Sequence, residues 1–372
     1  MGLRILLCTP MTGPSGYGVG SVVSGLLAAI RKREASVDIL KSSSKSGSAM
    51  EMPGMLGLAL YWFRALRYVR AHGPEYDALW LQSPMVPFPR RVADLGPPVV
   101  FTFHASYIGL YRAHLRYGVW YLVPYYLLGA AIERVLLLQL SKEKGRIKVT
   151  TVSPAARAEL IANGLRSQIV SIPNASRFAN SIPIAKSAAR RMLRERGIMI
   201  NDGDKVVIYV GRVTPGKRPL DVVGLFKQLR ARNRMAKLLV VGDGVLLDAV
   251  RKQGAVIGGV YAPGYIPSED LPVFYQAADL FVSMSLHEAF DLAAIEASGF
   301  GLPVALSAID AHRWLIESGL VRGLLITEST GAADLTKLLE EGGPVPHGTG
   351  SATLNWDDIA ASYLELLKGE TA

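Results

Sequence analysis

Residues 285–303 read Ser-Leu-His-Glu-Ala-Phe-Asp-Leu-Ala-Ala-Ile-Glu-Ala-Ser-Gly-Phe-Gly-Leu-Pro. An apolar strand, Leu280–Met284, precedes this run, and a second strand, Val304–Leu306, follows it. Glu288 is therefore expected on the loop at the carboxyl end of a strand, with Glu296 about two helical turns further on. Open α/β sheets bind ligands at this edge, and the helix that starts between the two glutamates offers free N–H groups to an anion. The stretch predicts a parallel α/β sheet whose ligand carries phosphate and hydroxyl groups.

Strand and helix patterns alternate along the rest of the chain. In the first half the expected strands are Arg4–Thr9, Ala78–Gln82, Val99–Phe103 and Val149–Ser153, and the expected helices are Ser21–Arg33 and Pro154–Asn163. In the second half the expected strands are Val206–Val210, Leu238–Val241, Val256–Tyr261, Leu280–Met284, Val304–Leu306 and Leu324–Ile326. Repeated βα units predict parallel sheets that are covered by helices on both faces.

Composition limits the class of protein. The 372 residues are enough for two domains of ordinary size. Cys8 is the single cysteine, which excludes a disulfide framework and favours a reducing compartment. The N-terminal apolar run is short and contains Pro10, so we expect a cytoplasmic protein and no signal peptide. The net charge of +10 suits anionic lipid or phosphorylated substrates, and because no nucleic-acid module is recognisable we expect no nucleic-acid partner.

A cationic loop follows the strand Val206–Val210. Arg212 and Lys217 lie five residues apart on it, so both can reach one diphosphate. The run from Gly211 to Lys217 is also close to a P-loop, which makes an NTPase the alternative function. A P-loop needs Ser or Thr after its lysine to hold Mg²⁺, however, and Arg218 stands there. The loop therefore favours phosphate binding without a metal.

Two features of the first half have both a functional and an ordinary explanation. The glycine-rich run Gly13–Gly20 follows the first strand, but Gly16 and Gly18 do not fit the spacing of a dinucleotide-binding loop, and a flexible turn explains them equally well. His104 follows the strand Val99–Phe103 at its carboxyl end, where ligands bind, although a lone histidine is more often a hydrogen-bonded structural residue.

Together, the two glutamates eight residues apart and the Gly-Arg-x4-Lys loop resemble the retaining glycosyltransferases of family 4. The stretch around Ile172-Pro-Asn also resembles the pattern that ends the first domain in that family. The resemblance implies the GT-B fold, an α/β architecture of two Rossmann-like parallel-sheet domains that face a central cleft. It implies metal-independent transfer of a hexosyl group from a nucleotide diphosphate sugar, a UDP- or GDP-sugar, with retention at the anomeric carbon. A nucleotide-sugar epimerase on the same fold is a further alternative.

The resemblance also implies roles for individual residues. Glu288 is expected to hold the sugar, Glu296 the ribose hydroxyls, and Tyr265 and Ile266 to lie near the base. The catalytic residues implied are His104, Arg212, Lys217 and Glu288. The donor-binding residues implied are Gly16, Gly18, Gly211, Gly242, Asp243, Tyr265, Ile266, Phe290, Asp291, Leu292 and Glu296. Asp291 departs from the family pattern, which usually has glycine there, and Ala105 departs from the common aspartate after the histidine.

The same resemblance divides the chain. Residues 1–178 are expected to form an N-terminal, acceptor-side domain and residues 185–352 a C-terminal domain that binds the nucleotide sugar, with the linker near 178–185. The C-terminal segment 353–372 is expected to contain a helix, about Trp356–Leu367, that crosses back to the first domain.

Two aromatic and basic stretches suggest a membrane-proximal acceptor. Residues 55–70 read as an amphipathic helix with Arg64, Arg67 and Arg70. Residues 107–132 are rich in aromatic side chains, but the uncharged run Tyr117–Ile132 contains Pro124, and we expect it to be too short and too interrupted to span a membrane. Ordinary helix packing explains both stretches equally well. The hypothesis is a peripheral enzyme on the inner face of the cell membrane that binds anionic lipid and glycosylates a lipid-linked glycan.

Overall fold

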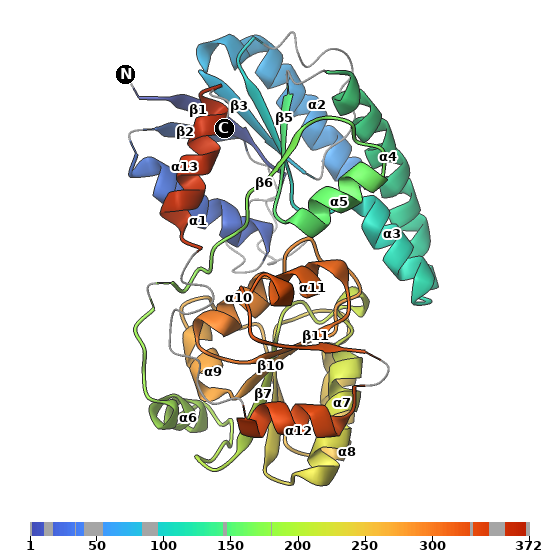
Figure 1. Cartoon of the computed structure of the whole chain (residues 1–372), viewed down its shortest axis with the longest axis vertical. Helices are drawn as coiled ribbons and strands as arrows, with labels where there is room; N and C mark the ends of the chain where they lie inside the picture. Colours follow the sequence, from blue (N-terminus) through green and yellow to red (C-terminus); the bar gives the residue numbers. More distant parts are fainter. Residues whose placement is uncertain are drawn as a thin grey trace. The chain divides into compact units, whose positions relative to one another are not determined.

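The computed structural model describes residues 2–10, 18–33, 35–40, 55–83, 96–143, 147–179, 181–327, 330–341 and 354–369. The chain forms two compact units. Unit 1 comprises Met1–Ala175 together with Leu354–Ala372, and unit 2 comprises Ser176–Thr353. Within the described residues each unit contains one six-stranded, parallel sheet with helices on both faces (Figure 1).

Unit 1 alternates strands and helices from the N-terminus. Its strands are β1 Arg4–Cys8, β2 Ser36–Leu40, β3 Ala78–Gln82, β4 Val99–Phe103, β5 Ile147–Thr151 and β6 Ile169–Ser171. Its helices are α1 Val19–Arg31, α2 Met55–His72, α3 Tyr107–Arg116, α4 Val123–Lys142, α5 Pro154–Ala162 and the C-terminal α13 Trp356–Leu367, with short 3₁₀ turns at Gly73–Glu75 and Trp120–Leu122. The strand order is β2-β1-β3-β4-β5-β6.

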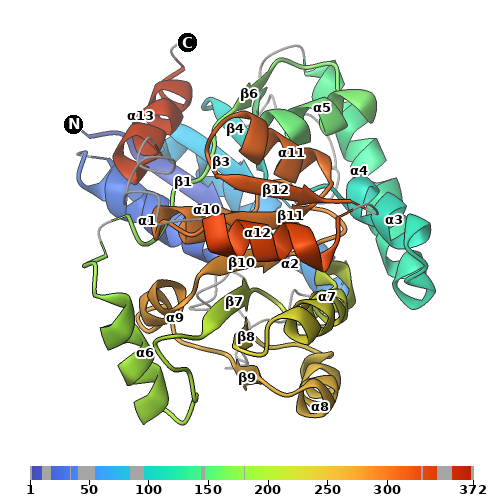
Figure 2. The ribbon, with the colours of Figure 1, turned by 60° about the horizontal axis from the view of Figure 1, so that its bottom comes forward.

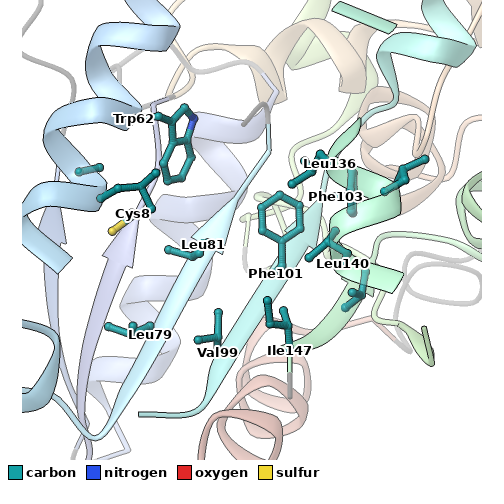
Figure 3. Close-up of a cluster of buried hydrophobic side chains, with 14 of the residues drawn as sticks. Cys8, Trp62, Leu79, Leu81, Val99, Phe101, Phe103, Leu136, Leu140 and Ile147 are labelled. Carbon is teal, nitrogen blue, oxygen red and sulfur yellow. The ribbon is translucent and has the colours of Figure 1, made fainter. Parts of the chain in front are cut away.

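The two faces of this sheet have separate cores because successive strand residues point to opposite sides. On one face Leu79, Leu81, Phe101 and Phe103 pack with Trp62 of α2 and with residues of α4 and α5 (Figure 3). On the other face Trp80 and Val100 pack against α1 and α13, and the Trp80 and Tyr363 rings lie 4.6 Å apart. The C-terminal helix therefore completes the core of unit 1.

Unit 2 repeats the pattern. Its strands are β7 Lys205–Val210, β8 Ala236–Val241, β9 Val260–Gly264, β10 Leu280–Ser283, β11 Val304–Ser307 and β12 Gly323–Ile326. Its helices are α6 Lys186–Glu195, α7 Pro219–Arg232, α8 Leu247–Ile257, α9 Leu271–Ala277, α10 Leu292–Gly299, α11 Asp310–Glu317 and α12 Ala332–Glu341, with a 3₁₀ turn at Pro215–Lys217. The strand order is β12-β11-β10-β7-β8-β9 (Figure 2). Helices α7, α8 and α12 cover one face of this sheet.

Each sheet has a point where the strand order reverses. In unit 2 it lies between β7 and β10, and in unit 1 it lies between β1 and β3. Loops on the two sides of such a point diverge at the carboxyl edge, which leaves a crevice where ligands of open α/β sheets bind. The topology therefore marks one candidate ligand position in each unit.

Three expectations from the sequence need correction. The strand expected at Val256–Tyr261 is wrong, because α8 continues to Ile257, and Gly258 and Gly259, with φ of 73° and 70°, end the helix before β9 begins at Val260. The edge strand β2 and the short strand β6 were not foreseen. Pro124 does not interrupt the helix it belongs to, because it occupies the first turn of α4, where no intrahelical N–H is needed.

The helix α4 is also longer than expected. Within the described residues one helical stretch, Trp120–Lys142, is long and apolar enough to cross a membrane. Part of α4 packs on the sheet of unit 1, through Leu136, Leu137 and Leu140, and 28% of the apolar stretch is buried. The buried Glu133 carboxylate on the same helix accepts hydrogen bonds from Ser106 Oγ at 2.7 Å and from the Tyr107 N–H at 2.5 Å.

Candidate functional site

The cationic loop of unit 2 begins at the end of β7, beside the point where the strand order reverses. Gly211 and Val213 donate backbone hydrogen bonds to Val241 (3.0 Å) and Asp243 (2.8 Å), so the loop after β7 runs alongside the loop after β8. A Cβ atom on Gly242 would lie 1.9 Å from the Gly211 carbonyl oxygen. The predicted donor-binding residues Gly211 and Gly242 thus form a tight contact between two backbones, which by itself requires glycine at 242.

Gly244 also makes a close backbone contact that leaves no room for a side chain. A Cβ atom there would lie 2.5 Å from the Val213 carbonyl oxygen, and its φ is 153°. Asp243, between the two glycines, is exposed, and its Oδ1 accepts a hydrogen bond from the Gly244 N–H. Steric fit explains the glycines of this motif, while the Asp243 side chain lies at the surface.

Lys217 and Glu288 form an ion pair across the reversal point. Lys217 ends the 3₁₀ turn after β7, Glu288 lies on the loop after β10, and the Lys217 Nζ donates to Glu288 Oε1. The Leu286 N–H donates to the Gly216 carbonyl at 2.9 Å, which fixes the two loops against each other. The side chains of Lys217 and Glu288 are 24% and 12% exposed, so the pair is partly open to solvent. Two residues predicted as catalytic are thus in direct contact.

The two arginines of the loop, Arg212 and Arg218, differ in their contacts. Arg212 is exposed, and among the described residues its guanidinium has no ion pair, so it remains available to an anion. Arg218 pairs instead with Asp221 in the first turn of α7. Arg218 also has a left-handed conformation, with φ of 51°, which is rare for a residue other than glycine and occurs in turns under tertiary constraint.

Asp291 caps the helix α10. Its Oδ1 accepts the Ala294 N–H at 3.2 Å, and its Oδ2 lies 3.0 Å from Nε2 of the buried His312. His312 Nδ1 lies 2.9 Å from the Ser307 carbonyl oxygen, which can only accept, so both ring nitrogens point at acceptors. Burial alone would raise the pKa of Asp291, but the hydrogen bond and charge of His312 outweigh it and lower that pKa to about 2. The Asp291 carboxylate is thus held by the side chain of His312 on α11, a contact that the sequence did not indicate.

The start of α10 offers an anion site. Helix geometry leaves the N–H groups of the first turn without intrahelical acceptors, and Asp291 takes only that of Ala294. The N–H groups of Leu292 and Ala293 remain at the helix N-terminus, which carries partial positive charge. Phe290, just before the cap, is largely buried, and its ring lies 6.0 Å from that of Trp314.

Glu296 is held by a second ion pair. Its side chain is 1% exposed and receives two hydrogen bonds from Arg177, Nε to Oε1 at 2.6 Å and Nη2 to Oε2 at 3.1 Å. Tyr275 donates to Oε2 at 3.0 Å, and burial together with the Glu296 carboxylate raises the pKa of Tyr275, which keeps this donor protonated. Arg177 also donates to Ser268 Oγ at 3.0 Å. A carboxylate has about four lone-pair positions, so one acceptor position of Glu296 remains.

Arg177 was not predicted as a site residue from the sequence. It follows the Ile172-Pro-Asn stretch and lies 119 residues from Glu296 in the chain. A single arginine among 41 basic residues carries no local signal of such a pairing.

The other residues of unit 2 predicted to bind the donor lie on the loop that follows β9 at the carboxyl edge. Tyr265 and Ile266 follow β9, and the Tyr265 side chain is exposed. Within the described ranges, no three His, Cys, Asp or Glu side chains are close enough to share a metal ion.

Two predicted residues belong to unit 1. Gly18 begins α1 with φ of 67°, and its carbonyl accepts the Ser21 N–H at 3.2 Å. His104 follows β4, and its N–H donates to Ser83 Oγ at 2.9 Å. Burial lowers the pKa of His104 to about 4, so its ring is neutral at physiological pH. Gly16 lies outside the described residues.

Family models match both units of this chain. Residues 194–347 match the model described as glycosyl transferases group 1, and residues 17–175 match the glycosyl transferase 4-like domain. The chain belongs to the group 1 glycosyl transferases. This confirms the family, known as family 4, that the Glu288–Glu296 spacing indicated.

Curated relatives are similar over part of the chain. O-antigen chain mannosyltransferase B of Escherichia coli is 32% identical over 121 residues, which is 31% of this chain and 32% of that protein. The 2-deoxystreptamine N-acetyl-D-glucosaminyltransferase of Streptomyces fradiae is 27% identical over 306 residues, 77% of this chain and 68% of that enzyme. For the first relatives the similarity thus spans about a third of their length.

Solved structures match over nearly the whole length. Sucrose-phosphate synthase from Thermosynechococcus elongatus has a TM-score of 0.75 at 20% identity and covers 99% of this chain and 98% of its own. Anabaena HepE, in complex with UDP-glucose, has a TM-score of 0.67 at 16% identity and covers 99% and 100%. These matches confirm the predicted GT-B fold, in which each domain is Rossmann-like.

Proposed function

We propose that this protein is a retaining glycosyltransferase that moves a hexosyl group from a nucleotide diphosphate sugar to an acceptor hydroxyl. The observation that carries the proposal is the meeting of Lys217, Glu288 and the start of α10 where the strand order of unit 2 reverses. A cation, a helix N-terminus and a carboxylate at one edge suit a ligand with phosphate at one end and hydroxyls at the other.

The ion pair suggests how the donor is received. Without ligand, Lys217 neutralises Glu288. A diphosphate near the exposed Arg212 and the N-terminus of α10 competes for Lys217, because phosphate oxygens accept from an ammonium at least as well as a carboxylate does. Once Lys217 turns to the phosphate, Glu288 is free to accept hydrogen bonds from the hydroxyls of the sugar.

The chemistry then follows from charge. The bond between the anomeric carbon and the diphosphate oxygen breaks, and the diphosphate leaves with the electron pair. Lys217, Arg212 and the helix N-terminus stabilise the negative charge that grows on it. The acceptor oxygen attacks from the same face and gives its proton to an oxygen of the departing phosphate, so the configuration is retained. His104 contributes a contact to the transferred sugar.

We propose that the nucleotide binds at the same carboxyl edge of the unit 2 sheet. Tyr265 and Ile266 line the position of the base, and the remaining acceptor position of Glu296 binds a ribose hydroxyl. Because HepE is described in complex with UDP-glucose, we take UDP-sugars as the first donors to test, followed by GDP-sugars.

For the acceptor we propose a lipid-linked glycan at an anionic membrane surface. The buried face of α2 lies in the core of unit 1, whereas its opposite face presents Leu56, Leu60, Phe63, Arg64 and Arg67 to solvent. Exposed apolar residues continue on α4 and on the turn before it, at Trp120, Tyr121, Leu127, Leu128, Val135 and Leu138. Met55, at the start of α2, lies against Gly129 of α4, so the two helices meet. Apolar side chains interspersed with arginines match the boundary between lipid tails and anionic headgroups.

A donor screen tests the proposed function. The purified chain is melted with UDP, UDP-glucose, UDP-N-acetylglucosamine, GDP, GDP-mannose and ADP-glucose, each with and without Mg²⁺. At about 100 times its Kd a ligand adds about 2.7 kcal/mol to stability. We expect one nucleotide sugar to stabilise the protein without Mg²⁺, and transfer of its radiolabelled sugar to a polyprenyl-linked glycan. Mg²⁺-dependent phosphate release from a nucleoside triphosphate, with no sugar transfer, would establish the NTPase instead.

A further inference from the structure

Two buried amide side chains in the described part of unit 1, Gln82 and Asn163, have no hydrogen-bond partner for either polar atom. Gln82 ends β3, is 1% exposed, and neither its Oε1 nor its Nε2 has a partner. A buried amide has lost its water, and without a replacement it destabilises the fold. Native proteins pair nearly all such groups, so an unpaired one at a ligand-binding edge indicates a partner from outside the chain.

Gln82 lies at the candidate ligand position that the strand order of unit 1 indicates. Its strand β3 is one of the two strands that flank the point where the strand order of unit 1 reverses. Gln82 pairs in register with Thr102 of β4 and, by alternation, shares a sheet face with Trp80. On this face the neighbouring polar groups are paired with one another, since Trp80 Nε1 donates to Thr102 Oγ1 at 2.8 Å and Thr102 Oγ1 lies 2.7 Å from Thr150 Oγ1. Among the described residues on this face of the sheet, the unpaired amide thus lies where β3 reaches its carboxyl end.

His104, at the end of the adjacent strand β4, adds a third unpaired atom. Ser83, the residue after Gln82, accepts the His104 N–H through its Oγ, and Ser83 itself donates its backbone N–H to Thr102 at 2.9 Å. These bonds hold the ends of β3 and β4 together. The Nε2 atom of His104 is buried and has no partner. Gln82 and His104 thus bring three unpaired polar atoms to two adjacent strand ends.

We propose that Gln82, at the carboxyl end of β3, binds a sugar hydroxyl beside the one that His104 contacts at the end of β4. The inference rests on the proposed function and adds Gln82 to it as a specificity-determining residue. The amide offers donors and an acceptor, and the neutral imidazole offers one of each. A hydroxyl group also donates and accepts, so neighbouring hydroxyls of a sugar satisfy all three atoms. A phosphate only accepts and would leave the Gln82 Oε1 facing an anion.

The first measurement needs no ligand. Gln82→Met keeps the length of the side chain and removes its polar atoms. Because the amide is unpaired in the free protein, we expect the variant to melt about 2–6 °C higher than the wild type. The control is Asn163→Leu. Asn163 is another buried amide with both atoms unpaired, but it ends α5, which carries the chain away from the carboxyl edge. A lower melting temperature for Gln82→Met would show that the amide has a partner within the protein and would overturn the proposal.

The second measurement uses the nucleotide sugar selected by the donor screen and its nucleoside diphosphate. If the hydroxyls belong to the transferred sugar, Gln82→Met binds the nucleotide sugar about tenfold more weakly and the diphosphate equally well. If they belong to the acceptor, donor binding is unchanged and KM for the acceptor rises about tenfold. Asn163→Leu changes none of these values.

Unchanged donor binding and unchanged KM in Gln82→Met overturn the site while leaving the proposed function intact. A wild-type protein that no nucleotide sugar stabilises defeats the proposed function, and this inference with it.

Discussion

The two units share an architecture but differ in how the polar side chains at the carboxyl edge of the sheet are paired. Where the strand order of unit 2 reverses, the buried and half-buried charged groups are already paired, Lys217 with Glu288 and Asp291 with His312, and Arg212, which has no ion pair among the described residues, is exposed. Where it reverses in unit 1, Gln82 and the neutral His104 carry unpaired atoms. In a site for a charged ligand the buried charges of the protein are paired before the ligand binds. Burying an isolated charge costs far more free energy than burying an isolated amide.

Their surfaces differ as well. In unit 1, large exposed apolar side chains gather on α2 and on the stretch from α3 to α4, whereas in unit 2 they are scattered singly, as at Met235 and Val256. Scattered apolar residues are normal on a soluble surface, but a gathered set marks an interaction face. Each of the following predictions tests one side of this contrast.

The largest effect is expected at the buried ion pair of unit 2. Arg177→Met leaves the Glu296 carboxylate buried with only Tyr275 as a donor, and we expect a loss of about 3–5 kcal/mol in the free energy of unfolding. Urea denaturation measures it. The control is Arg251→Met, whose pair with Asp248 is exposed and is expected to contribute at most about 0.5 kcal/mol. Equal, small losses in both variants would show that the charges of unit 2 are not held as described.

The next largest effect concerns turnover. Lys217→Ala removes the cation that the proposal places on the leaving diphosphate, and kcat is expected to fall about 10²–10³-fold while the far-ultraviolet dichroism stays native. Lys227→Ala, an exposed lysine on α7, is the matched control and should keep wild-type turnover. Undiminished transfer by a folded Lys217→Ala protein would discredit the phosphate clamp of unit 2.

A pH dependence is expected from unit 1. Burial, opposed by hydrogen bonds from Ser106 and Tyr107, raises the pKa of Glu133 from 4.5 to about 7. Between these values the folded protein holds a proton that the unfolded chain has released, so the stabilisation is complete below pH 4.5 and is lost as the pH rises through about 7. From pH 5 to pH 8, wild type should lose about 2 kcal/mol more unfolding free energy than Glu133→Gln. Parallel curves for the two proteins would contradict the raised pKa.

The smallest effect is expected at the apolar face of unit 1. Cosedimentation with vesicles of phosphatidylglycerol and phosphatidylcholine should show salt-sensitive binding. Phe63→Ser and Arg67→Gln should each weaken it by about fivefold, because an arginine near an anionic surface contributes about 1 kcal/mol. Met235→Ser, at an isolated exposed residue of unit 2, is the control. Absence of binding, or equal binding by all three variants, removes the membrane from the proposal.

Most elements could be predicted from local patterns. The strands Ala78–Gln82 and Val99–Phe103 are confirmed to the residue, and Ser153 caps α5 through the Ala156 N–H as expected. The errors arose where local patterns are ambiguous. An apolar run at Val256–Tyr261 fits a strand or a helix end, and only the positive φ of Gly258 and Gly259 separates them. A proline such as Pro124 breaks a helix interior but suits a helix start.

The amino-acid sequence alone indicated the parallel α/β architecture, the family and the position of Glu288 after a strand. These features depend on βα periodicity and motif spacing, which involve residues only a few positions apart. The sequence did not indicate that Arg177 holds Glu296, that His312 holds Asp291, or that Gln82 has no partner. Those facts depend on which distant residues folding brings within 3 Å of one another, and hydrogen bonds and ion pairs are defined by that distance alone.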